Sequence, residues 1–213
     1  MFEKFVVLLT DWNKKVNLVS RRDADNIWAN HILHSISPLF KIILREDAVI
    51  LDLGTGGGLP GIPLRIMMPL AEMTMLDSTQ KKITAVKDMI QRMDLIRTQA
   101  LWGRAEDVGL KKGYIHSFHY VVARAVGPLA DLVRLSKPFL FRSHTAPDEA
   151  NVDFQPATVF PPALIVFKGG DLEKEISQIR SLKFVKAVDV IQLAFEGSEE
   201  VSLTDKKLVL VRF

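Results

Sequence analysis

A glycine-rich turn between an aliphatic strand and an apolar helix constrains this chain more than any other feature. Residues 52–61, DLGTGGGLPG, begin at the end of the aliphatic run 48–53 and directly precede the predicted helical run 62–68. Glycine permits positive φ and lets a ligand approach the backbone, and the first turn of a helix presents N–H groups that have no partner within the helix. The sequence therefore predicts that this turn holds a ligand against bare backbone.

Short aliphatic runs alternate with helical segments from residue 48 onward, which is typical of βα units that build a largely parallel sheet. The predicted strands and the helices between them are 48–53, 73–77, 79–93 (helix), 98–102, 118–123, 128–140 (helix), 163–168, 171–182 (helix), 185–193 and 207–213. The polar turn at 197–200 is too short for a crossover helix, so the last two strands are expected to form an antiparallel hairpin. The fold class is therefore predicted to be α/β.

The amino-terminal part has a different pattern. Apolar residues recur every three or four positions in 2–12 and again in 27–35, which predicts helices. We expect residues 1–46 to form a helical cap and residues 47–213 to form the main domain. The polar, proline-containing segment 142–162 is interpreted as a long loop to which no function is assigned.

Composition limits the possible classes of function. With 48% hydrophobic and 25% charged residues, the 213-residue chain is typical of a folded globular protein. The absence of cysteine excludes disulfides, thiolate metal sites and cysteine nucleophiles, and it fits a cytoplasmic location. No apolar run long enough for a membrane span and no secretion signal is expected. The formal net charge of +3 is compatible with an anionic partner such as RNA.

The glycines fit two known patterns. Asp52, Gly54, Gly56 and Gly58 have the spacing D-x-G-x-G-x-G, which resembles the first motif of class I methyltransferases. Gly56 and Gly58 also belong, with Gly61, to a G-x-G-x-x-G pattern, which is typical of dinucleotide-binding folds. The acidic residue at the strand end, the glycine directly after it and the predicted terminal hairpin favour the methyltransferase.

Asp77, at the end of the second predicted strand, does not separate the two patterns. A carboxylate there can accept hydrogen bonds from the ribose hydroxyls of either S-adenosylmethionine or a nicotinamide cofactor. A nicotinamide-dependent Rossmann oxidoreductase is therefore an alternative function. A non-catalytic RNA-binding module that keeps an unused cofactor pocket is another.

A longer stretch of sequence carries a more specific resemblance. Residues 51–64, LDLGTGGGLPGIPL, resemble the signature of the ribosomal RNA small subunit methyltransferase G family, also called the glucose-inhibited division protein B family. The similarity covers most of residues 10–170 and includes 12–18, 31–35, 76–78, 103–107 and 123–125. The resemblance implies a Rossmann-like class I methyltransferase with a seven-stranded sheet. It also implies S-adenosylmethionine as methyl donor and, as acceptor, the N7 of a guanine in a decoding-region loop of 16S ribosomal RNA in the small ribosomal subunit.

The resemblance also implies roles for individual residues. Gly54 and Leu59 correspond to cofactor contacts, and Ala105 and Glu106 fall where the family holds the adenine region. Arg124 corresponds to an arginine beside both cofactor and substrate. Together with Asp52, Gly56, Gly58 and Asp77, these residues form the predicted cofactor site.

Guanine N7 carries a lone pair and no proton, so methyl transfer to it requires no general base. The predicted task of the side chains is to position the substrate, and the candidates are Arg124, Arg104, Lys168 and His31. The arginines suit phosphates or base edges, with surface ion pairs as the alternative, and a structural histidine is the alternative for His31. The histidine spacing does not favour a metal site, and we expect a monomer.

Three further expectations concern the surroundings of the predicted site. Gly57 stands where members of the similar family commonly have proline. The segment 142–162 is longer than the connection that usually precedes the fifth strand in that family. Lys82 belongs to a basic helix face that would contact RNA phosphates or simply be solvated. Large aromatic residues more often pack in the core than stack on bases, so Trp12, Trp28 and Trp102 are expected to be buried.

Overall fold

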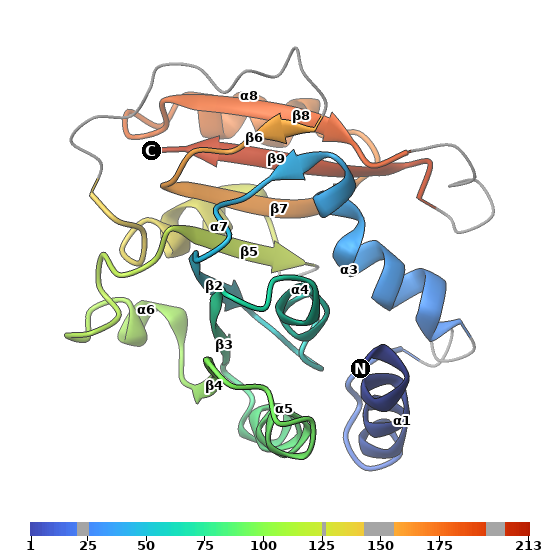
Figure 1. Ribbon diagram of the computed structural model, residues 1–213. Helices are drawn as coiled ribbons and strands as arrows, with labels where there is room; N and C mark the ends of the chain where they lie inside the picture. The colour runs from blue at the N-terminus through green and yellow to red at the C-terminus, as the bar shows by residue number, and fades with distance from the viewer. Residues whose placement is uncertain (21–25, 125–126, 143–155, 195–202) are drawn as a thin grey trace.

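A computed structural model describes residues 1–20, 26–124, 127–142, 156–194 and 203–213. Its main element is a seven-stranded sheet with the order β4-β3-β2-β5-β7-β9-β8 (Figure 1). The strands are β2 (Val49–Leu53), β3 (Glu72–Asp77), β4 (Thr98–Trp102), β5 (Tyr120–Arg124), β7 (Ala163–Gly169), β8 (Ala187–Gln192) and β9 (Lys206–Arg212). The first five strands in this order run parallel, and β9 is antiparallel to both its neighbours. The predicted α/β class and terminal hairpin are confirmed, while the turn at 197–200 lies outside the described residues.

Helices cover both faces of the sheet because the central strands are apolar on both sides. Ile50 and Tyr120 face one hydrophobic cluster, which the sheet shares with α1 (Phe2–Asn13), α4 (Gly61–Met67) and α5 (Gln80–Arg92). Leu51 and Val121 face the second cluster, under the opposite layer. That layer consists of α6 (Ala105–Val108), α7 (Leu129–Ser136) and α8 (Glu173–Arg180). The predicted helices therefore flank the sheet, one or a few residues shorter at their ends than expected.

The amino-terminal segment is helical, as predicted, but ends in a short strand. After α1 come the π-helix η1 (Trp28–Leu33), α3 (His34–Ile36), the 3-10 helix η2 (Ser37–Phe40) and β1 (Ile42–Ile43). β1 pairs in parallel with β6 (Ala157–Thr158), which lies within the segment predicted to be loop. The expectation that all of residues 1–46 are helical and the expectation that 142–162 is entirely loop were therefore wrong at these strands. A two-residue strand is too short to produce a periodic pattern.

The first helix packs directly on the core of the main sheet. Phe5, Leu8 and Leu9 are buried in the same cluster as the sheet residues. The indole N–H of Trp12 donates a hydrogen bond of 2.7 Å to Asp88 on α5. The predicted boundary near residue 47 therefore separates two segments that share one core. No helix in the described ranges is long and apolar enough to cross a membrane.

Two tryptophans are not in the core. Trp28 is 48% exposed and Trp102 is 54% exposed, so the expectation that both are buried was wrong. Trp102 is the last residue of the edge strand β4, where the sheet has a neighbour on one side only. An aromatic side chain at the end of an edge strand has too few neighbours to be enclosed.

A buried tyrosine links the main sheet to the small one. The Tyr120 hydroxyl donates a hydrogen bond of 2.7 Å to the carbonyl of Val159, directly after β6, and its side chain has no exposed surface. Replacing Tyr120 by phenylalanine would leave this carbonyl without its donor. An unsatisfied buried polar group costs about 1–3 kcal/mol.

We therefore predict that Tyr120→Phe lowers the free energy of unfolding by about 1–3 kcal/mol in urea denaturation. Tyr114→Phe is the matched control, because Tyr114 is only half-buried and lines an open cavity. Equal stability of Tyr120→Phe and the wild type would contradict the linking role of this hydrogen bond.

Candidate active site

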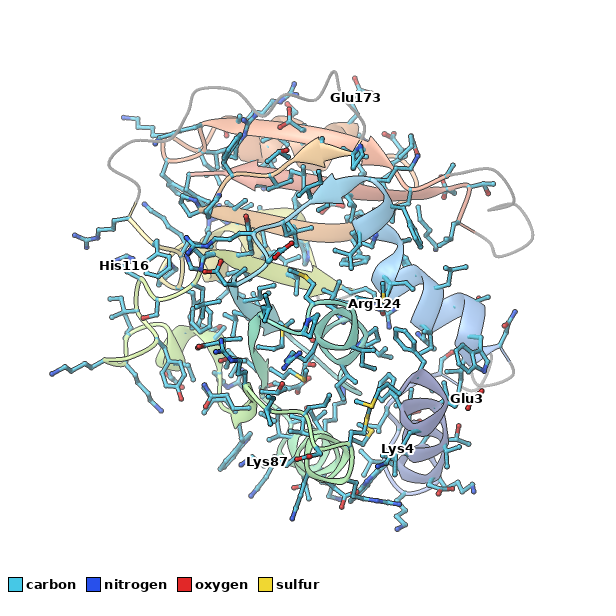
Figure 2. The ribbon with its side chains drawn as sticks, in the orientation of Figure 1. Glu3, Lys4, Lys87, His116, Arg124 and Glu173 are labelled. Atoms are coloured by element: carbon cyan, nitrogen blue, oxygen red, sulfur yellow. The ribbon has the colours of Figure 1, made fainter. Side chains whose placement is uncertain are left out.

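The carboxyl ends of β2, β3 and β5 bring the predicted site residues to one edge of the sheet. The glycine turn follows β2, Asp77 is the last residue of β3, and Arg124 extends from the end of β5 (Figure 2). Ligands in open α/β folds bind outside the carboxyl ends of the strands. The site is therefore assembled by topology from segments that are about 70 residues apart in sequence.

The glycine turn adopts a conformation that favours glycine at three positions. Gly54, Gly56 and Gly58 have φ angles of 76°, 56° and 84°. A Cβ on Gly58 would lie 2.6 Å from Cδ1 of Ile62, so this position also lacks space for a side chain. The N–H groups of Gly54 and Thr55 both donate to the carbonyl of Leu76, at 2.8 and 3.0 Å, and fix the turn to the end of β3.

Asp52 lies beneath the turn and has no exposed surface. Its Oδ2 accepts hydrogen bonds from the Thr55 hydroxyl at 2.6 Å and from the Gly61 N–H at 2.9 Å. Burial raises the pKa of this carboxyl group to about 6, and the two hydrogen bonds oppose that rise. Asp52 holds the turn together in this structure, and its predicted contact with the cofactor stays a prediction.

The same carboxylate explains Gly61. A Cβ at this position would lie 2.6 Å from Oδ2 of Asp52 and 3.0 Å from Cε of Met75. Close packing of the start of α4 on the sheet therefore requires glycine, whatever the ligand. The G-x-G-x-x-G pattern seen in the sequence is thus accounted for without a dinucleotide.

Asp77 is buried to 8% exposure at the end of β3. Its Oδ2 accepts the Gly56 N–H at 3.0 Å and its Oδ1 accepts the Thr79 N–H at 2.7 Å. The exposed Trp102 is its partner in the register of β4 and donates its indole N–H to the Ser78 carbonyl at 3.0 Å. Sequence reasoning missed this aromatic neighbour because it expected Trp102 to be buried.

Residues predicted for the adenine region follow β4. Ala105 is half-buried and Glu106 is exposed, both in the first turn of α6, and Arg104 is exposed directly before it. These positions lie after the strand adjacent to Asp77, on the same edge of the sheet. Their assignments are compatible with the topology and remain predictions.

A cavity of about 220 Å³ opens beside the glycine turn. The predicted residues that line it are Gly54, Gly56, Leu59, His31 and Arg124. The other lining residues are Thr55, Gly57, Lys82 and the segment of residues 18–20. The predicted residues that do not line the cavity are Asp52, Gly58, Asp77, Arg104, Ala105, Glu106 and Lys168. Lys82 had been placed on a basic helix face, and only the three-dimensional structure brings it to the turn.

Arg124 and His31 form a polar pair in this cavity. Nη2 of Arg124 lies 3.0 Å from Nδ1 of His31, and Nη1 donates to the Asn30 carbonyl at 3.4 Å. A guanidinium only donates hydrogen bonds, so Nδ1 of His31 is the acceptor and its ring proton is on Nε2. His31 thereby restricts the orientation of Arg124, and its predicted function in positioning the substrate stays a prediction.

Lys168 serves a different part of the structure. Its Nζ donates to the two carboxylate oxygens of Glu175 on α8, at 2.8 and 3.1 Å, and to the Gly127 carbonyl at 3.1 Å. Glu175 also accepts the Leu129 N–H at the start of α7, at 2.6 Å. Lys168 thus joins β7 to α7 and α8, and its predicted contact with the substrate stays a prediction.

The residues around the turn suit S-adenosylmethionine. A Cβ added to Gly56 would meet no atom closer than 4.0 Å, so this glycine leaves open a space that a side chain would fill. The positive charge of Lys82 in the cavity lining suits the carboxylate of the amino-acid part, and the carboxylate oxygens of Asp77 suit the ribose hydroxyls, as predicted. The cavity of about 220 Å³ is smaller than the roughly 300 Å³ of typical ligand sites, and Asp77 lies outside its lining.

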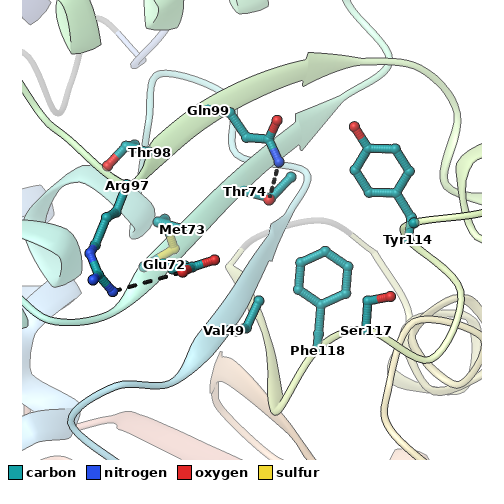
Figure 3. A pocket seen from close by; sticks show the side chains of 11 residues that line it. Val49, Glu72, Met73, Thr74, Arg97, Thr98, Gln99, Tyr114, Ser117 and Phe118 are labelled. Carbon is teal, nitrogen blue, oxygen red and sulfur yellow. Dashed lines mark hydrogen bonds and ion pairs between the residues drawn. The ribbon is translucent and has the colours of Figure 1, made fainter.

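The larger cavity, of about 610 Å³, lies at the opposite edge of the sheet (Figure 3). It begins at Val49, Glu72 and Thr98, the first residues of β2, β3 and β4. Gln99 donates to the Thr74 hydroxyl across it at 3.0 Å. None of the predicted site residues lines this cavity, and size alone therefore does not identify the site. The described residues also contain no group of three or more side chains that suits a metal ion.

The strand order and the glycine turn define a class I methyltransferase fold, and solved structures support this class. A predicted O-methyltransferase from Agrobacterium tumefaciens has a TM-score of 0.58 at 14% identity, covering 85% of this chain and 79% of that one. Aeropyrum pernix fibrillarin, solved with bound S-adenosylmethionine, has a TM-score of 0.58 at 13% identity, covering 86% and 75%. At these identities the likeness concerns the fold alone.

Sequence comparisons are more specific. Residues 1–146 match the family model described as rRNA small subunit methyltransferase G. Ribosomal RNA small subunit methyltransferase G of Bacteroides fragilis is 36% identical over 99% of this chain and 90% of its own length. The Porphyromonas gingivalis enzyme is 34% identical over 84% and 74%. The chain therefore belongs to the rRNA small subunit methyltransferase G family, and its cofactor is S-adenosylmethionine. The nicotinamide alternative is not supported.

His34 lies next to this site and is half-buried, with its Nε2 atom enclosed by the protein. Its ring packs edge-on against Phe167 with centroids 5.4 Å apart. Burial, followed by the nearby charge of Arg124, lowers the pKa of His34 to about 3. The imidazole is therefore neutral in the folded protein at all ordinary pH values.

This pKa predicts a loss of stability in acid. Below about pH 6.5 the unfolded chain protonates His34 while the folded protein does not until about pH 3, so unfolding becomes easier as pH falls. His34→Leu removes this proton uptake. The stability of the wild type relative to His34→Leu should fall by about 1.4 kcal/mol per pH unit below pH 6.5, measured by urea denaturation. Parallel pH profiles for the two proteins would contradict the buried neutral state.

Proposed function

We propose that this chain transfers the methyl group of S-adenosylmethionine to the N7 of a guanine in 16S ribosomal RNA of the small ribosomal subunit. The observation that carries the proposal is the cavity in which the open backbone at Gly56 and the Arg124–His31 pair lie together. Membership in the family supports the ribosomal RNA substrate. A ribosomal RNA substrate favours a reaction in the cytoplasm, where ribosomes are assembled. The proposed enzyme acts as a monomer.

The reaction needs positioning more than proton transfer. When bound, S-adenosylmethionine supplies an electrophilic methyl group on a sulfonium centre. Guanine N7 attacks through its lone pair and loses no proton, so the side chains of the site need not include a general base. Holding two reactants at near-attack distance supplies up to about 7–11 kcal/mol of a reaction barrier. The residues around the cavity are expected to act by this means.

Arg124 is the side chain best suited to hold the guanine nucleotide. Its planar guanidinium donates in a fixed fork that matches the O6 of guanine or a phosphate oxygen. The hydrogen bond to His31 restricts the orientation of that fork. Leu59, which lines the cavity, belongs to the same proposal as a cofactor contact. The proposal also includes Arg104 and Lys168 as substrate contacts and Asp52, Gly58, Ala105 and Glu106 as cofactor contacts. Lys82 adds a cation beside the turn.

Labelled methyl transfer tests the proposed reaction and substrate together. Small ribosomal subunits that lack the modification are incubated with the protein and labelled S-adenosylmethionine, and the labelled nucleoside is then identified. Label in 7-methylguanosine of 16S RNA is the expected result. Label in another nucleoside, or no label despite cofactor binding, would remove the proposed acceptor and leave the methyltransferase class.

Arg124→Lys keeps the positive charge and loses the planar fork. Hydrogen bonds to charged groups are worth about 1.5–3 kcal/mol, so kcat/KM for the RNA is expected to fall by about 10- to 100-fold. Arg134→Lys is the matched control, because Arg134 is an exposed arginine on α7 paired with Asp131. Equal activity of the two variants in the transfer assay would contradict the positioning function of Arg124.

A further inference from the structure

The segment after α1 folds back over the glycine turn and is held there by one side chain. Asn13 is the last residue of α1, and its Oδ1 accepts hydrogen bonds from the N–H groups of Leu18 at 2.8 Å and Val19 at 3.0 Å. A single acceptor thus fixes two consecutive backbone groups. The chain between Asn13 and Leu18 is closed into a compact loop in this way.

The loop is packed on the turn as well as on its own helix. A Cβ placed on Gly57 would lie 3.1 Å from Cβ of Leu18 and 3.1 Å from Cδ1 of Leu9. Val19 is buried to 6% exposure in the hydrophobic cluster of the main sheet. The glycine turn and the loop therefore fit against each other with little free space, and a shift of one requires a shift of the other.

Residues 18–20 form one wall of the 220 Å³ cavity. Across that cavity lie Gly54, Gly56 and Arg124, and Lys82 completes the lining with the turn. The wall consists of backbone and small or apolar side chains, so its position matters more than its chemical groups. The wall is anchored at its base, because Trp12 fixes the end of α1 to α5.

We propose that Asn13 is a positioning residue for cofactor binding: it holds residues 18–20 as the wall that encloses the amino-acid end of S-adenosylmethionine. The inference rests on the proposed function, because the cavity must be the methyl-donor site. The wall is expected to make the same contacts with the cofactor in the ground state and in the transition state. Loss of such contacts weakens binding and leaves the rate at saturation nearly unchanged.

Two variants at position 13 test whether the hydrogen-bond acceptor of Asn13 is needed for cofactor binding. Asn13→Ala removes the acceptor and frees both N–H groups, whereas Asn13→Asp keeps an oxygen that accepts both hydrogen bonds. The loss of two hydrogen bonds predicts that the Kd of S-adenosylhomocysteine rises at least about tenfold in Asn13→Ala. The KM for S-adenosylmethionine should rise in parallel, with kcat within about threefold of the wild type. Asn13→Asp should bind within about threefold of the wild type.

Lys14→Ala is the matched control, because Lys14 is the next residue, is exposed and pairs with Asp11. Calorimetric titration with S-adenosylhomocysteine and urea denaturation are carried out on the full chain in all variants. If Asn13→Ala does not fold, Leu18→Ala replaces it, because this variant trims the wall and keeps the backbone hydrogen bonds. Leu18→Ala is then expected to show the same rise in Kd.

The outcomes distinguish this inference from the proposed function. Wild-type affinity in Asn13→Ala or Leu18→Ala would overturn the inference and leave the proposed function intact. A fall in kcat with unchanged Kd would also overturn it. If the wild type binds S-adenosylhomocysteine but does not methylate 16S RNA, the proposed substrate is removed. The Kd of Asn13→Ala relative to the wild type then still tests the positioning function of Asn13. Absence of any binding to the wild type would remove both proposals.

Discussion

The carboxylate of Asp52 accepts hydrogen bonds from the Thr55 hydroxyl and the Gly61 N–H in the interior of the protein, and the geometry of the site depends on these two bonds. They hold the start of α4 so close to the sheet that Gly61 must be glycine. The chain between them then has to turn through positive φ angles, which glycine adopts at the least cost. The open backbone at Gly56 follows from this buried interaction.

The cavity beside the turn combines three segments that are distant in sequence. The turn supplies backbone, β5 supplies Arg124, and the amino-terminal segment supplies His31 and the wall of residues 18–20. The amino-terminal helices are therefore part of the site as well as part of the core.

Much of the fold could be predicted from the sequence, because the strands are long aliphatic runs and the glycine turn has a characteristic spacing. The pairing of β1 with β6 could not, since two residues carry no periodicity. Asp52 was interpreted as a ligand contact, and only its burial reveals that it holds the turn. The ion pair of Lys168 with Glu175 and the wall at residues 18–20 depend on tertiary contacts that no local pattern indicates.

We expect S-adenosylmethionine to bind against the open backbone at Gly56. Calorimetric titration with S-adenosylhomocysteine tests this binding most directly. Gly56→Ala places one methyl group in the open space beside the backbone of Gly56, without a contact closer than 4.0 Å to the rest of the protein. Gly170→Ala is the control, because Gly170 also has a positive φ, of 72°, and open space around its Cβ. Similar backbone strain of about 1–2 kcal/mol is expected in both variants. We predict that affinity is lost in Gly56→Ala and kept in Gly170→Ala. Equal affinities of the two variants would contradict binding of the cofactor against Gly56.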